Sequence, residues 1–148
     1  MNIIKSLLLL GLISIGTVSC SNSDSSNNEQ TESHSANHHH PVQLNNGELW
    51  DANIETTQGV ENMIKIMESY TEMESVSAFT ELTASLKQEF AQIFEKCTMT
   101  GAAHDQLHNF LIPIKEQFPK LSSSNVTECQ ESFDQLHAHL KSYHQYFK

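Results

Sequence analysis

Four amphipathic patterns follow one another between Val60 and Phe147, and they constrain the fold more than any other feature of the chain. In each pattern apolar residues recur every three or four positions, which places them on one face of an α-helix. The four sets are Val60, Met63, Met67 and Tyr70; Phe79, Leu82, Leu86, Phe90, Ile93 and Cys97; Leu107, Leu111, Ile114 and Phe118; and Val126, Cys129, Phe133, Leu136, Leu140, Tyr143 and Phe147. No sustained alternation of apolar and polar residues follows Ile54, so the sequence predicts an all-α fold.

Short polar segments separate the four patterns. Thr56 and Thr57 are expected to cap the first helix, and Asn125 with Glu128 three positions later forms a capping box for the fourth. Pro113 predicts a kink or an early end in the third helix. Because short connections favour antiparallel neighbours, residues 42–148 are predicted to form an up-down-up-down four-helix bundle.

That topology predicts which residues meet at one end of the bundle. The second helix ends there and the third begins there, so the end should hold Cys97, Met99, His104 and His108. Trp50 is expected nearby, because it precedes the first helix. Cys129 begins the fourth helix at the other end, roughly 20 Å or more from Cys97 at 1.5 Å per residue. A disulfide needs Cα atoms within about 7 Å, so the topology argues against a Cys97–Cys129 bridge, although an oxidising compartment would favour one.

The stretch KCTMTGAAHDQLH, residues 96–108, gathers donor atoms that suit a transition metal. His104 and His108 are four apart and project from the same side of a helix, Cys97 offers a thiolate and Met99 a thioether. This set suits copper first, with zinc less favoured, and it matches a blue copper centre in ligand identity alone. His137 and His144 could approach as auxiliary ligands, whereas His139 is expected to face solvent.

Other interpretations of this stretch remain open. Cysteine, methionine and histidine at a helix end are also ordinary packing and hydrogen-bonding residues, so the motif could simply fix the turn of a structural or partner-binding bundle. A b-type haem between histidine and methionine is a further alternative. A thiol enzyme built on Cys97, His104 and Asp105 is not favoured, because no oxyanion-hole signal accompanies them.

The N-terminal residues resemble a bacterial lipoprotein signal. Lys5 precedes an apolar run that is too short to span a bilayer, and TVSC follows at 17–20. The resemblance implies a signal peptide over residues 1–19 and lipidation of Cys20, with ordinary secretion and a free Cys20 as the alternative. Residues 20–41 are rich in Ser, Asn and His, and they predict a disordered tether whose histidines could capture metal loosely. We therefore expect a lipid-anchored protein of the bacterial envelope, at the outer membrane.

Charge narrows the classes of partner. The chain contains no arginine, and eight lysines face eighteen acidic residues for a formal net charge of −10. Such a chain is poorly suited to bind nucleic acid or anionic lipid headgroups, and it is better suited to bind cations. The sequence indicates no particular protein partner.

Three segments together resemble an uncharacterised Bacteroidota family of small helical lipoproteins. They are LNNGELW at 44–50, CTMTGAAHDQLHNFLIPI at 97–114 and YHQYF at 143–147. The resemblance implies a four-helix envelope lipoprotein with a CTMxGxAHxxLH motif, and it draws attention to Cys97, Met99, Gly101, His104, Asp105, Leu107 and His108. It implies no activity. The hypothesis from the residues is therefore a non-enzymatic metal-binding lipoprotein.

Overall fold

Four helices make up most of the part of the chain that the structure describes. The structure, a computed structural model, describes residues 40–148. The predicted signal peptide, Cys20 and nearly all of the predicted tether lie outside these residues. The helices are α1 Ile54–Glu68, α2 Val76–Lys96, α3 Gly101–Leu121 and α4 Val126–Lys141, and a short 3-10 helix, η1 Tyr143–Gln145, follows. Within residues 40–148 the only β pairing consists of two isolated bridges, Asn45 with Glu48 and Trp50 with Phe147.

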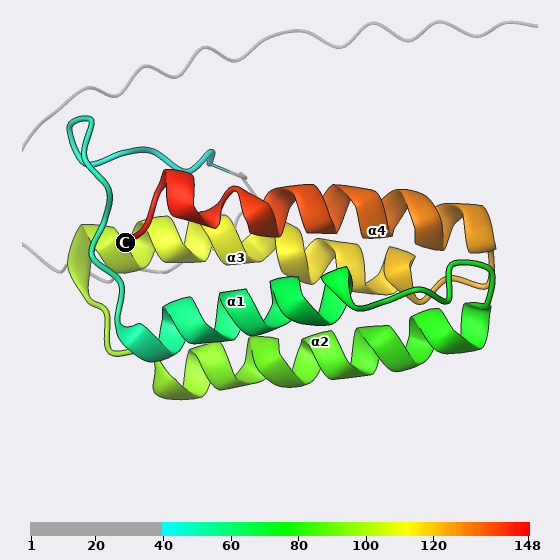
Figure 1. Cartoon of the computed structure of the whole chain (residues 1–148). Coiled ribbons are helices and arrows are strands. Elements are labelled where there is room, and N and C mark those ends of the chain that lie inside the picture. The colour runs from blue at the N-terminus through cyan, green and yellow to red at the C-terminus, as the bar shows by residue number, and fades with distance from the viewer. Residues whose placement is uncertain (1–39) are drawn as a thin grey trace, which may run out of the picture. The chain divides into compact units, whose positions relative to one another are not determined.

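The helices run alternately up and down the bundle, as the sequence predicted (Figure 1). Each helix packs against its neighbours in the chain, and α1 also packs against α4 to close the bundle. The apolar sets predicted from periodicity line the interior, where Val60, Leu86, Ile114 and Leu136 are fully buried. Phe110 and Leu121 are also buried core residues that the predicted stripe of α3 missed.

The predicted cap of α1 was wrong, and of the two outcomes predicted at Pro113, a kink or an early end of the helix, the early end does not occur. α1 begins at Ile54 after Asn53, so Thr56 and Thr57 lie inside the helix rather than capping it. α3 does not end at Pro113 but continues through Pro113 and Pro119 to Leu121. A proline inside a helix removes one hydrogen bond, and here the burial of Ile114 and Phe118 on the core face holds the helix together across the gap.

The predicted cap of α4 is confirmed. The Asn125 side chain accepts hydrogen bonds from the backbone N–H groups of Thr127 and Glu128, at 2.9 and 3.4 Å. The Glu128 carboxylate completes the box only through Ser123: the backbone N–H of Asn125 donates to the Ser123 hydroxyl at 3.1 Å, and that hydroxyl donates to Glu128 at 2.5 Å. None of the helices between residues 40 and 148 is both long and apolar enough to span a membrane.

Candidate functional site

Asn53 fixes the turn between α2 and α3 at the end of the bundle where the motif lies. Its amide nitrogen donates to the backbone carbonyl of Lys96 at 3.1 Å, and its amide oxygen accepts from the backbone N–H of Thr98 at 3.4 Å. The same oxygen accepts from the Thr56 hydroxyl at 2.7 Å. Sequence reasoning missed Asn53 because it placed the cap of α1 three residues too late.

Gly101 begins α3 with a backbone conformation that other residues avoid. Its φ is +62°, which is in the left-handed region, and an added Cβ would meet no atom within 4 Å. The requirement for glycine is therefore conformational rather than steric. This turn directs the chain into α3 so that its first two turns carry His104 and His108.

Cys97, His104 and His108 form a row of polar contacts at the start of α3. The Cys97 sulfur lies 3.7 Å from Nδ1 of His104, and Nε2 of His104 lies 2.9 Å from Nε2 of His108. Cys97 and His104 are half-buried, while His108 is exposed. The motif therefore brings together three of its four predicted donors, with the imidazole of His104 in the middle.

The position of the ring protons determines what this row can do. When Nδ1 of His104 carries the proton, it can donate to the Cys97 sulfur, and Nε2 of His104 then presents a lone pair toward His108. A histidine that binds a metal usually donates its other ring N–H in this way, which fixes its tautomer and orientation. Cys97 is thus placed to orient His104.

The row is not the four-ligand arrangement predicted from the sequence. Cys97 and His108 contact opposite nitrogens of the His104 ring, so the three donors do not surround one point. Met99 is partly buried and packs against the hydrophobic core. Within residues 40–148 no group of three or more His, Cys, Asp or Glu side chains is placed to hold a metal ion.

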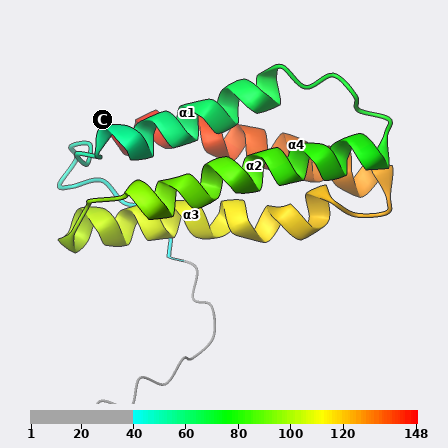
Figure 2. The same cartoon turned by 90° about the horizontal axis from the view of Figure 1, so that it is seen from below.

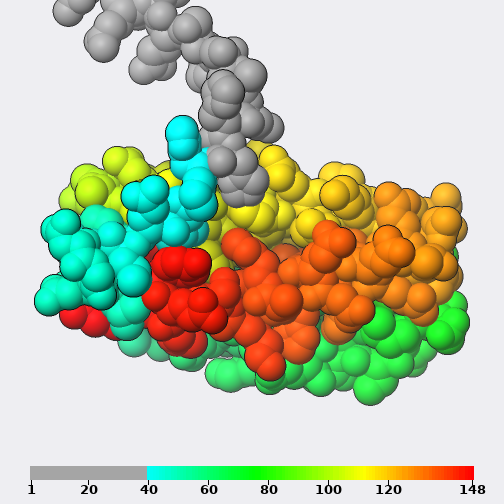
Figure 3. All heavy atoms as spheres, turned by 90° about the horizontal axis from the view of Figure 1, so that it is seen from above, coloured from blue at the N-terminus to red at the C-terminus, as the bar shows by residue number. Residues whose placement is uncertain are grey.

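The segment that precedes α1 covers this end of the bundle. Trp50 pairs through its backbone with Tyr146 and Lys148, at 2.8 and 2.9 Å. Its indole N–H donates to the carbonyl of Gln43 at 2.6 Å, and the backbone N–H of Gln43 donates to the Gln106 side chain of α3 at 2.7 Å. Figure 3 shows this segment, coloured cyan, resting on α3 and on the C-terminal residues. Trp50 therefore lies at the end of the bundle where the sequence placed it.

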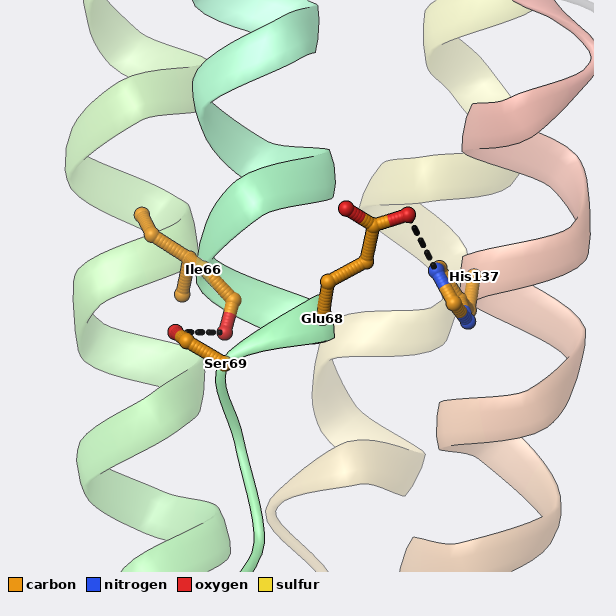
Figure 4. A network of polar contacts seen from close by, with 4 residues as sticks. All are labelled: Ile66, Glu68, Ser69 and His137. Carbon is orange, nitrogen blue, oxygen red and sulfur yellow. Dashed lines mark hydrogen bonds and ion pairs between the residues drawn. The ribbon is translucent and has the colours of Figure 1, made fainter.

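The two predicted auxiliary histidines contact α1 rather than the row. Nε2 of His137 lies 4.0 Å from a carboxylate oxygen of Glu68, the last residue of α1, where Figure 4 shows the two side chains facing each other. Nε2 of His144 lies 3.8 Å from a carboxylate oxygen of Glu61. The approach of these residues to the motif, expected from the sequence, is thus not seen among the contacts of residues 40–148.

His139 does not face solvent, so that expectation was wrong. Its ring stacks on Phe110 with centroids 4.5 Å apart, and its Nε2 donates to the Phe110 carbonyl at 2.8 Å. Sequence reasoning placed His139 by helical phase alone and did not include Phe110 in the core. A histidine at the edge of the apolar face of a helix can stack its planar ring on a neighbouring aromatic side chain instead of pointing into solvent.

Cys129 lies at the start of α4, away from the motif, as the bundle order predicted. Its thiol is buried, both described cysteines are free, and its sulfur donates to the carbonyl of Ser123 at 3.3 Å. Burial raises the pKa of the Cys129 thiol, which keeps it protonated and unreactive at neutral pH.

Comparison with models of known protein families, with curated proteins and with solved structures found no match to this chain. The resemblance to a Bacteroidota family therefore stays a prediction.

Proposed function

We propose that this protein is a lipid-anchored protein of the bacterial envelope that binds a transition metal ion, copper before zinc, at one end of its bundle. His104 and His108 are the ligands, and Cys97 positions His104 by accepting the hydrogen bond of its Nδ1–H. The observation that carries the proposal is the 2.9 Å separation of the two Nε2 atoms. Two nitrogens bound to one tetrahedral ion at about 2.0–2.1 Å are about 3.3 Å apart, so the two rings would separate slightly. The hydrogen bond between them would be replaced by the metal, with His108 carrying its ring proton on Nδ1.

Charge and donor type support the choice of metal. A chain with a formal net charge of −10 attracts cations. Imidazole suits both copper and zinc, and for divalent ions a given site binds copper more tightly. Water or a donor from another molecule would complete the coordination, since two protein ligands leave positions open.

The position of Cys97 bears on the role of the metal. A blue copper centre requires cysteine as a direct ligand, and here the sulfur lies on the far side of the His104 ring from His108. An open site with two histidines is better suited to sequestration or delivery, because the ion can be exchanged. Electron transfer is therefore less well supported than sequestration or delivery.

Copper titration of the full chain in lipid nanodiscs tests the proposal. The tether histidines, His34, His38, His39 and His40, are first replaced by serine so that they do not contribute. One equivalent of Cu(II) is expected to bind, and His104→Ala or His108→Ala should abolish it. His144→Ala is the matched control and should bind as the parent does. Cys97→Ser should weaken binding without abolishing it, because the hydroxyl can still accept the hydrogen bond from His104.

A structural role of the motif is the competing function, and one observation favours it. The hydrogen bonds of Asn53 and the Cys97–His104–His108 row tie α1, α2 and α3 together without any metal. This alternative predicts no stoichiometric copper binding by the parent protein. Full binding by both His104→Ala and His108→Ala would equally refute the metal site.

A further inference from the structure

An apolar groove lies between α2 and α3, the two helices that run side by side in Figure 2. It consists of two adjoining hollows of about 350 and 270 Å³, which share Phe90 and Lys115. From His108 to Pro119 the groove follows about 17 Å of α3, at 1.5 Å per residue. Its apolar lining, called the α2–α3 groove below, is Phe90, Phe94, Leu111, Ile112, Phe118 and Pro119.

Aromatic side chains form a continuous row along this groove. Phe118 packs on Phe90 with ring centroids 5.3 Å apart, Phe90 on Phe94 at 5.0 Å, and Phe94 on His108 at 6.0 Å. Phe94 is 48% exposed although it belongs to a helix whose other large apolar residues mostly face the core. An exposed apolar patch of this kind marks an interaction surface more often than a scattered surface residue does.

The charges at the groove are opposite to those of the rest of the chain. Lys87 and Lys115 both line one hollow, and Nζ of Lys87 lies 5.8 Å from the ring centre of Phe118. No acidic residue is among the described residues that line either hollow, although the chain has eighteen acids and eight lysines. The groove is therefore a locally basic and apolar surface on an acidic protein.

From this combination we propose that the α2–α3 groove binds an amphipathic, acidic helix of a partner protein. The apolar face of that helix packs on Phe90, Phe94 and Ile112, which are at least partly exposed, and its carboxylates pair with Lys87 and Lys115 on the two margins. This is the helix-in-groove mode of recognition, in which anchors repeat at three and four residues. The interaction does not depend on metal, but it would place the partner directly beside His108.

Two other occupants fit the groove less well. A second copy of this chain, docked through the same groove, would bring lysines close to lysines, which is unfavourable. A single acyl chain with an anionic headgroup would lie in a groove that is open along Phe94, so one side of the chain would stay in water. An amphipathic helix covers the groove and turns its own polar face to solvent.

Binding of three labelled peptides of about 18 residues, which span about 27 Å as helices, tests the proposal. The first has leucines at helical spacing flanked by glutamates, the second has lysines in place of the glutamates, and the third scrambles the first. Fluorescence anisotropy is measured with the full chain in nanodiscs of zwitterionic lipid, with empty nanodiscs as the blank. The acidic amphipathic peptide is expected to bind, and the other two should bind at least about tenfold more weakly.

Matched variants locate the binding. Phe94→Asp should lower the affinity for the acidic peptide at least tenfold, while Ile54→Asp, at a residue that is 63% exposed on α1, should leave it unchanged. The double variant Lys87→Glu and Lys115→Glu should reverse the preference, so that the lysine peptide binds more tightly, whereas Lys65→Glu on α1 should not. That reversal distinguishes a charge-complementary groove from general stickiness.

Several outcomes would overturn this inference. Equal binding of the scrambled peptide, or an equal loss in Ile54→Asp, would show that the groove has no specificity. Sedimentation that reveals dimers sensitive to Phe94→Asp, without peptide binding, would assign the groove to a second copy. Capture of anionic vesicles through Lys87 and Lys115, again without peptide binding, would assign it to lipid. None of these results depends on whether copper binds.

Discussion

Gly59 of α1 packs closely against Ile93 of α2, and replacing it by alanine gives a sharp test of the packing. A Cβ at this position would lie 2.5 Å from Cγ1 and 3.1 Å from Cδ1 of Ile93, which is fully buried. Overpacking of a core costs about 1–3 kcal/mol. Alanine in a helix interior gains about 1 kcal/mol over glycine. We therefore expect Gly59→Ala to destabilise the protein by about 1 kcal/mol overall.

Gly59→Ala should stabilise the protein instead of destabilising it when the side chain of Ile93 is shortened. Ile93→Ala removes Cγ1 and Cδ1 and leaves only Cβ, which would lie 3.8 Å from the new methyl group, an ordinary contact. In that background Gly59→Ala should stabilise the protein by about 1 kcal/mol, through helix propensity alone. Urea unfolding of the four proteins measures both steps, and the expected coupling is roughly 2 kcal/mol. Stabilisation by Gly59→Ala in both backgrounds would refute the close packing of α1 on α2.

Two further predictions concern backbone conformation and pH. Gly101→Ala should lower the free energy of unfolding by about 1–2 kcal/mol because φ is +62°, and Gly101→Asn should cost less because asparagine tolerates this region; urea unfolding compares them. Burial raises the pKa of the Tyr143 hydroxyl above its ordinary value of 10.0, while its hydrogen bond with Thr57 opposes the shift. Its contribution to stability is thus fully present below pH 10 and is lost as pH rises through the folded pKa, so unfolding curves for Tyr143→Phe should show a shallower alkaline loss than the parent. An unchanged alkaline slope would contradict this assignment.

The fold could be predicted from the sequence because burial follows apolar periodicity. The stripes of all four helices lie on the core, and short connections leave few ways to arrange antiparallel neighbours. The helix boundaries were harder to predict, because capping depends partly on tertiary partners. Asn53 bonds with Lys96 and Thr98, which are distant in sequence, and only the modest preference for asparagine over threonine at an N-cap distinguishes it locally from Thr56.

The candidate site was predicted in part. Helical spacing correctly placed His104 and His108 on one side of α3, and topology correctly brought Cys97 beside them. Which nitrogen of His104 each neighbour contacts depends on side-chain rotamers, which a sequence does not specify. The α2–α3 groove was also missed. Phe94 and Lys115 lie outside the core stripes, and they form one surface only because α2 and α3 pack side by side.

The stability of the metal-loaded protein offers the clearest separation of the two functions proposed for the motif. Metal bound only to the folded state at one hundred times its dissociation constant adds about 2.7 kcal/mol to the free energy of unfolding. Without metal, each hydrogen bond in the Cys97–His104–His108 row contributes about 1 kcal/mol. Bound metal would replace the hydrogen bond between the two Nε2 atoms and keep the one between Cys97 and His104. A metal site therefore predicts that copper stabilises the parent protein but not His108→Ala. If the motif is purely structural, His104→Ala loses stability by the same amount in both conditions, and copper changes neither unfolding curve.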